Sequence, residues 1–233
     1  MTPPAAPGQE GQPAAGSVQS LYPFLYQGST DVPAVLDQVR QSTVAKASEI
    51  IELRRVVLDR DGPRLMECAG DIAARFAAGG RLLAFGNGGS ATDAQQLAAL
   101  FLHPGGDRRP LPALSLASDT SVITALCNDI GVDVVFARQI AAFGSKRDVV
   151  VGLSTSGNSE NLVRAFDEAG RRGMLTIGIA GYQGGRMAEL DSIDYLFVAP
   201  SASVHRIQEA QTTVYHALWE LTLATLGREQ VTP

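Results

Sequence analysis

The stretch VVVGLSTSGNSENL at residues 149–162 decides the fold. A continuous apolar run enters a turn rich in serine, glycine and asparagine, and that turn enters a helical pattern. The stretch LLAFGNGGSATDA at residues 82–94 repeats this construction. Continuous apolar runs are typical of parallel strands that helices cover on both faces. The two stretches therefore predict a doubly wound α/β fold. Both turns follow the carboxyl end of a strand, which is where such sheets bind ligands.

The rest of the chain extends this pattern. From residue 80 onward we expect strands at 81–86, 112–116, 148–154, 174–180 and 193–199, and helices near 90–102, 119–127, 134–143, 159–172, 185–190 and 203–227. Before them we expect a helical pair, one helix with Asp31 as its N-cap and one that follows Asp61-Gly62-Pro63. The chain thus divides into a Pro/Gly-rich flexible tail and lead-in at 1–30 and a single domain at 31–228. Within that domain, the N-terminal helices occupy 31–79, and the sheet core with the C-terminal helix occupies 80–228.

Composition excludes several classes of protein. The formal charge is −5, from 24 acidic and 19 basic residues without a basic run, so nucleic acid is not expected as a direct ligand. No apolar run reaches the roughly 20 residues of a membrane span, and no membrane partner is expected. Cys68 and Cys127 are far apart in apolar segments. We interpret them as reduced thiols of a cytoplasmic protein, with a disulfide as the less favoured alternative.

The two turns favour a small phosphorylated ligand. In the first, Gly88 and Gly89 allow close backbone approach, while Asn87 and Ser90 add hydrogen-bonding side chains. The second gathers hydroxyl and amide side chains, namely Ser154, Thr155, Ser156, Asn158 and Ser159. Hydroxyls and free N–H groups at a helix N-terminus hold phosphate without a lysine. The alternative is that these residues only cap helices. Neither turn has the spacing of a nucleotide-binding loop.

The final helical pattern carries an unusual polar stripe. Its members, at spacings of three and four, are His205, Gln208, Glu209, Thr212 and His216. A solvent-facing stripe would ordinarily be filled with Lys and Glu, so this one is predicted to line a cavity. His216 is predicted to belong to a functional site, against the alternative of a structural histidine.

Taken together, these segments resemble the SIS (sugar isomerase) domain, and most of all the phosphoheptose isomerases. The resemblance covers about residues 32–228 and rests on GNGGSATDA at 86–94, CND at 127–129, STSGNS at 154–159, GxxGG at 181–185 and RIQE at 206–209. It implies a flavodoxin-like sandwich around a five-stranded parallel sheet, in a homotetramer whose sites are shared between subunits. The apolar surface left over on the N-terminal helices agrees with a homo-oligomer, a dimer or a tetramer. The implied reaction interconverts sedoheptulose 7-phosphate and its aldose partner.

The resemblance also implies roles for matching residues. Asn87, Gly88, Gly89 and Ser90 would contact the sugar, Asn128 and Asp129 would approach its hydroxyls, and Ser154, Thr155, Ser156 and Ser159 would hold the phosphate. Gln208 would also bind substrate. Gln208 and His216 match a glutamine and a histidine that can bind zinc in the family, although no cofactor is expected to be required. His216 would be the base that moves the proton between C1 and C2.

The chain departs from the family at the acid/base positions. Gln96 stands where the family has a second histidine, and Leu100 stands where it has a catalytic glutamate. His205 replaces an acidic residue, and Pro104 replaces an arginine. Two functions therefore stay open. The first, which we favour, is an isomerase of a phosphorylated sugar with His216 as base and His205 or water assisting. The second is a non-catalytic sugar-phosphate-binding protein that regulates a protein partner.

Overall fold

A computed structural model describes residues 32–229 of the chain. The predicted tail at 1–16 and the predicted N-cap Asp31 lie outside the described residues. One compact unit ends at Ala45, and a second starts at Lys46 and holds the sheet.

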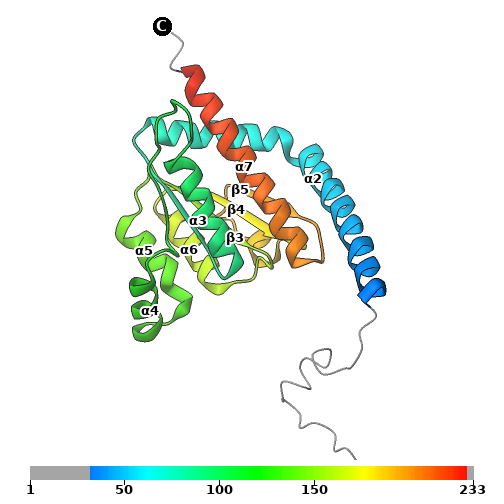
Figure 1. The fold of residues 1–233 in the computed structure, drawn as a ribbon. Coiled ribbons are helices and arrows are strands. Elements are labelled where there is room, and N and C mark those ends of the chain that lie inside the picture. Colours follow the sequence, from blue (N-terminus) through cyan, green and yellow to red (C-terminus); the bar gives the residue numbers. More distant parts are fainter. Residues whose placement is uncertain (1–31, 230–233) are drawn as a thin grey trace, which may run out of the picture. The chain divides into compact units, whose positions relative to one another are not determined.

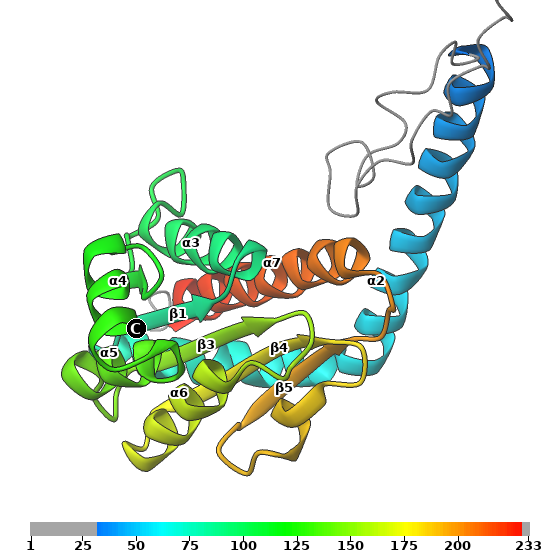
Figure 2. The same cartoon turned by 90° about the horizontal axis from the view of Figure 1, so that it is seen from below.

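Five parallel strands form one sheet (Figure 2). They are β1 (Leu82–Gly86), β2 (Ala113–Ser115), β3 (Val149–Ser154), β4 (Leu175–Gly181) and β5 (Tyr195–Ala199). Their order across the sheet is β2-β1-β3-β4-β5, with all neighbours parallel. Each predicted strand is confirmed to within two residues at either end. The strand order reverses between β1 and β3, and a crevice opens at such a switch point beyond the carboxyl ends of the two strands.

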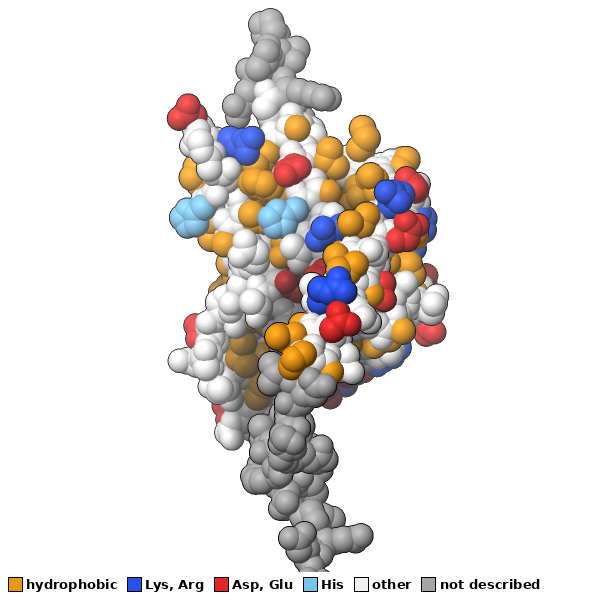
Figure 3. Space-filling model, turned by 45° about the vertical axis from the view of Figure 1, so that its right-hand side comes forward, with side chains coloured by type: hydrophobic (Ala, Val, Ile, Leu, Met, Phe, Trp, Pro, Cys, Tyr) orange, Lys and Arg blue, Asp and Glu red, His pale blue; other side chains and the backbone are white. Residues whose placement is uncertain are grey.

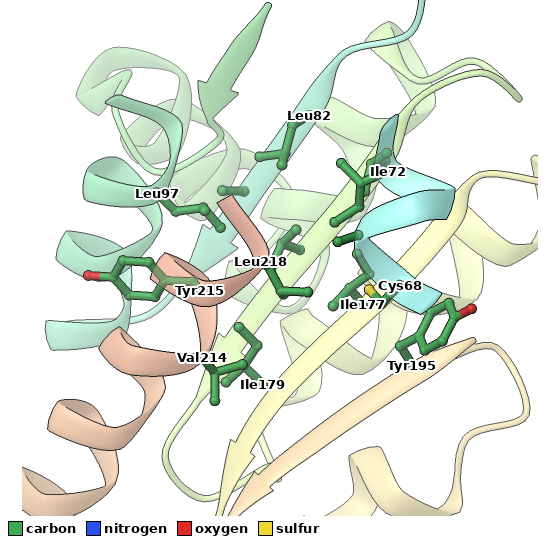
Figure 4. Packing of buried hydrophobic residues seen from close by; sticks show 14 of the residues in the cluster. Cys68, Ile72, Leu82, Leu97, Ile177, Ile179, Tyr195, Val214, Tyr215 and Leu218 are labelled. Atoms are coloured by element: carbon green, nitrogen blue, oxygen red, sulfur yellow. The ribbon is translucent and has the colours of Figure 1, made fainter. Parts of the chain in front are cut away.

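Helices cover both faces of the sheet. The part of α2 (Val32–Ala77) that lies in the second unit packs on one face, together with α7 (Val204–Glu229) and α3 (Gly89–Leu102) (Figure 1). The other face carries α5 (Val135–Phe143) and α6 (Glu160–Arg171), next to α4 (Thr120–Asp129). Short 3₁₀ turns occupy Val132–Val134 and Gly185–Glu189. Figure 4 shows how the first layer closes: Leu97 of α3, Leu218 of α7 and Ile72 of α2 converge on strand residues such as Leu82 and Ile177. The predicted doubly wound fold is confirmed.

The predicted helical pair is wrong in one respect, because α2 runs without a break through Asp61-Gly62-Pro63. A proline inside a helix removes one backbone hydrogen bond and costs about 3 kcal/mol. The buried face of the helix continues across it, through Leu53, Val57, Asp61, Leu65, Cys68, Ile72 and Phe76. Each large apolar side chain on that face gains about 1.5–3 kcal/mol on burial. Packing along this stripe therefore outweighs the cost of the proline.

Two arginines of α2 reach the outer strand of the sheet. Arg60 donates to the carbonyl oxygen of Val198, and Arg64 donates to that of Leu196 at 3.2 Å. Between them the carboxylate of Asp61, 3% exposed, pairs with Arg60 at 2.5 Å and with Arg64 at 3.8 Å. The buried charge on the helix thus fixes both guanidinium groups against the edge of β5.

The surface does not separate the two signs of charge. On the face drawn in Figure 3, acidic and basic side chains lie next to one another among hydrophobic atoms. None of the described helices combines the length and hydropathy needed to cross a membrane.

Candidate functional site

The two predicted turns lie side by side at the switch between β1 and β3. The side-chain amide of Asn87, directly after β1, donates to Asn161 in the first turn of α6, and Asn161 donates back, both at 2.9 Å. Asn161 is only 5% exposed. This reciprocal amide pair ties the first turn to the helix that follows the second turn. Both turns follow the carboxyl end of their strand, as the sequence predicts.

The second turn holds its shape through its own serines. Ser154 Oγ accepts a hydrogen bond from the Gly157 N–H at 3.0 Å, and Ser156 Oγ accepts one from Asn158 at 3.2 Å. Ser159 is the N-cap residue of α6, yet within the described chain its hydroxyl caps no N–H of the helix. The alternative of a pure capping cluster therefore fails for Ser159. Its hydroxyl stands at a helix N-terminus, where an anion is favoured.

The loop after β4 presses against this second turn. Gly157 has φ +68, and a Cβ there would lie 1.9 Å from the carbonyl oxygen of Gly184. The Arg186 N–H donates to Asn158 Oδ1 at 2.9 Å, and the Met187 N–H donates to the Gly157 carbonyl at 3.0 Å. The GxxGG segment at 181–185 is therefore a support for the turn that follows β3.

Helix α7 brings two glutamines to the same end of the sheet. The side chain of Gln208 lies on Gly89, where an added Cβ would be 2.1 Å from Gln208 Nε2. Gln211 is fully buried and donates to the carbonyl oxygens of Ser154 and Ile179, both at 3.1 Å. Gln208 thus lies beside the first turn, while Gln211 holds the carboxyl ends of β3 and β4.

His216 lies in an aromatic setting further along α7. Its ring centroid is 5.2 Å from that of Tyr215 and 6.1 Å from that of Trp219, which it meets edge-on. Figure 4 shows the Tyr215 ring beside Leu97 with its hydroxyl pointing out of the cluster. That hydroxyl interacts with Asp93 of α3, and burial raises the pKa of both groups. Among the described residues, Asp93 Oδ2 is buried without a hydrogen-bond partner.

Several predicted residues are arranged differently from the expectation. Ser90 is buried, and Gly88 rather than Ser90 occupies the N-cap position of α3. Asn128 and Asp129 end helix α4 instead of lying in a loop, and the Asn128 amide donates to the neighbouring carboxylate at 2.8 Å. Asp119 caps the start of α4 by accepting from the Val122 N–H at 3.0 Å, and at the other end the N–H groups of Ile130 and Gly131 both donate to the Leu126 carbonyl at 3.0 Å.

The departures from the family pattern have clear places in the structure. Gln96 is exposed on α3, whereas Leu100 on the same helix packs against the hydrophobic core. His205 is exposed in the first turn of α7. Neither Gln96 nor Leu100 can carry a proton between carbon atoms, whereas His205, Glu209 and His216 of α7 and Asp93 of α3 are ionisable.

A zinc site is not complete within one chain. Across residues 32–229, no group of three or more His, Cys, Asp and Glu side chains is placed to hold a metal ion. Gln208 and His216 offer two donors, fewer than the three or four protein ligands of a zinc site. The described residues of a single chain therefore do not fit a complete zinc site.

Sequence reasoning missed Asn161 and Gln211, which hold the two turns in place. Both are polar residues on the buried side of an amphipathic helix, Asn161 beside Leu162 and Gln211 beside Ala210. An uncharged polar residue at a core-facing position is a usable signal, because a buried amide needs hydrogen-bond partners.

Comparison with known proteins gives a consistent result. The family model of the SIS domain matches residues 47–181. The chain is 42% identical over 174 residues to a phosphoheptose isomerase of Aquifex aeolicus, covering 74% of this chain and 90% of that protein. It is 45% identical over 187 residues to one of Desulfovibrio desulfuricans, covering 80% and 88%. The solved phosphoheptose isomerase of Neisseria gonorrhoeae matches with a TM-score of 0.72 at 35% identity, covering 78% of this chain and 97% of that chain. That of Francisella tularensis matches at 0.71 and 30%, covering 81% and 97%.

Proposed function

We propose that this chain, which belongs to the SIS domain family and to the phosphoheptose isomerases within it, interconverts a ketose and an aldose form of a phosphorylated sugar. The observation that carries the proposal is the pairing of the two turns across the β1/β3 switch by Asn87 and Asn161. One turn supplies hydroxyls at a helix N-terminus for the phosphate. The other supplies glycine backbone and an amide for the sugar, within reach of Gln208.

The proposed binding roles follow from this geometry. Thr155 and Ser159 bind the phosphate together with free N–H groups of α6, while Ser154 and Ser156 keep the turn in shape and complete the set of hydroxyls. Asn87, Gly88, Gly89, Ser90 and Gln208 hold the sugar. The contact of Asn128 and Asp129 with sugar hydroxyls stays a prediction.

The proposed chemistry is a proton transfer. A base takes the proton from the carbon next to the carbonyl group, which leaves an enediol, and the proton returns to the neighbouring carbon to give the isomeric carbonyl compound. His216 is proposed as this base because an imidazole exchanges protons near neutral pH. His205 or water assists at the oxygen atoms. No step requires a metal, and zinc binding by Gln208 and His216 stays a prediction.

One observation favours a second candidate function. Leu100, which is half-buried and packs against the core, stands at the position where the family has a catalytic glutamate, so α3 offers no acid at that point. A sugar-phosphate-binding protein that regulates a protein partner would keep the two turns and lose the acid/base pair in this way.

The deciding experiment is NMR of the protein with sedoheptulose 7-phosphate in deuterated water. Passage through an enediol exchanges the transferred proton with solvent, even when net conversion is small. We expect exchange with the wild-type protein, and a decrease of roughly 10²–10⁴-fold in His216→Gln. Affinity for the sugar phosphate should stay nearly unchanged, because the phosphate contacts lie on β3 and α6.

His103→Gln is the matched control, since His103 is exposed at the end of α3. Binding of the sugar phosphate without any proton exchange would instead favour the regulatory protein. Full exchange in His216→Gln would reject His216 as the base.

The proposal also covers the oligomeric state and the cellular location of the protein. A homo-oligomer, with four subunits as in the resemblance, is supported by the exposed apolar side chains of α2. A cytoplasmic location is supported by two free cysteines, Cys68 and Cys127, which lie on different helices.

A further inference from the structure

An acidic side chain lies where the proposed function places a phosphate. Glu160 is the first residue of α6 and follows Ser159 directly. A phosphate ester carries a charge of about −1.5 to −2 near neutral pH. An acidic residue in this position stabilises its own helix. The same carboxylate, left free, would repel the phosphate group.

Two arginines from different elements hold this carboxylate. Arg164, one turn further along α6, donates from Nε to Glu160 Oε1 at 2.7 Å. Arg186, in the 3₁₀ turn after β4, lies with Nη1 2.5 Å from Glu160 Oε2. Both carboxylate oxygens are therefore paired, and the three side chains together carry a net charge of +1. The pairing lowers the pKa of Glu160, with Arg186 as the largest cause.

The backbone of Arg186 is fixed at the same place. Its N–H donates to Asn158 Oδ1 in the phosphate turn at 2.9 Å. Gly185, the preceding residue, approaches so closely that a Cβ there would lie 2.4 Å from the carbonyl oxygen of Ser156. Arg186 thus belongs to the support of the turn, and its guanidinium group bridges that support to the start of α6.

We propose that Arg186 is a positioning residue for phosphate binding, which neutralises Glu160 and turns an acidic helix start into a site that accepts a dianion. This inference rests on the proposed function of the second turn. Arg186 acts through Glu160 and needs no contact with the ligand. Asp133 also acts electrostatically on Arg164, so Arg186 is the better residue to test.

The test is calorimetric binding of sedoheptulose 7-phosphate, and of inorganic phosphate as a probe independent of the sugar, at low and high salt. Arg186→Met should weaken both affinities by about three- to tenfold at low salt, because Glu160 Oε2 loses its partner and one positive charge is removed near the anion. The loss should shrink as salt screens the exposed charges. Glu160→Gln combined with Arg186→Met should bind within about twofold of Glu160→Gln alone. Where turnover is measurable, KM should change and kcat should not.

Arg171→Met is the matched control, since Arg171 pairs with Glu168 at the opposite end of α6 at 2.6 Å. Its affinity should equal that of the wild type. Arg186→Lys keeps the charge and should bind like the wild type, which separates the electrostatic role from any loss of folding. Unchanged affinity in Arg186→Met, or a loss that Glu160→Gln fails to restore, would overturn the inference while the wild type still binds. A wild-type protein that binds neither probe would overturn the proposed function as well.

Discussion

Asp93 shows how a single residue can oppose stability at a candidate site. Its carboxylate is partly buried on α3, and burial raises its pKa above the ordinary value of 3.8. The folded protein therefore binds a proton more readily than the unfolded chain. Between the two pKa values stability falls as the pH rises, and the full cost is present above the folded-state pKa. A carboxylate that costs stability at a candidate site is consistent with a role in that site.

Asp93→Asn should accordingly raise the free energy of unfolding at pH 7, because the amide has no charge to desolvate. The gain should diminish as the pH falls toward 4. Denaturant unfolding across this range measures it.

Asp148→Asn should behave in the opposite way. Burial raises the pKa of Asp148, but hydrogen bonds from Arg81 and Ser145 outweigh it and lower the pKa. Losing those charge-assisted bonds should cost about 1.5–3 kcal/mol of unfolding free energy at pH 7, and less in acid.

A stability gain for Asp93→Asn that is constant across pH would contradict our account of Asp93.

At the scale of elements, two buried glutamines make a natural comparison. Gln211 of α7 donates to the carbonyl oxygens of Ser154 and Ile179, both at 3.1 Å. Gln139 of α5 donates to those of Leu116 and Val135, at 3.0 and 3.1 Å. Both side chains are buried, but only Gln211 touches a strand end that carries the phosphate turn.

Gln211→Leu and Gln139→Leu should each lower the free energy of unfolding by about 1–3 kcal/mol, since buried carbonyl groups lose a donor. Only Gln211→Leu should also weaken binding of the sugar phosphate, because Ser154 loses an anchor. Thermal unfolding and calorimetry together test this difference. Equal affinities in the two variants would show that the anchor does not set the geometry of the turn.

The elements also show what could be predicted from sequence. Strands such as 148–154 were predictable because continuous apolar runs end at serine and glycine. The continuity of α2 could not be predicted, because Gly62 and Pro63 are local signals of a helix break. The buried apolar stripe that outweighs them forms only when the helix packs on the sheet. The turns at 87–90 and 154–159 were recognisable from their residues. The roles of Asn161 and Gln211 were not recognisable, because their hydrogen-bond partners are distant in sequence.

At the scale of the whole molecule, α2 leaves apolar side chains facing outward. Ile51 is 56% exposed, Leu58 is 61% exposed and Met66 is 66% exposed. Exposed apolar side chains on one helix are a candidate surface for contact with another chain. A second copy of the chain is the partner that the resemblance implies.

Light scattering at micromolar concentration should therefore report a dimer or a tetramer. Leu58→Glu together with Met66→Glu should shift the population toward smaller species by burying charge at the contact, while Glu67→Gln, a change at another exposed position of α2, should not. A wild-type protein that is monomeric under these conditions would refute the proposed assembly.

The arginines that contact β5 affect how exposed this edge of the sheet is to other molecules. β5 is the last strand in the sheet order, so its outer carbonyl groups would be available to a strand of another molecule. Arg60 and Arg64 occupy the acceptors of Val198 and Leu196. A chain that loses this part of α2 would present an open template for intermolecular pairing. Two long side chains that belong to neither the core nor the candidate site thus cover this edge of the sheet.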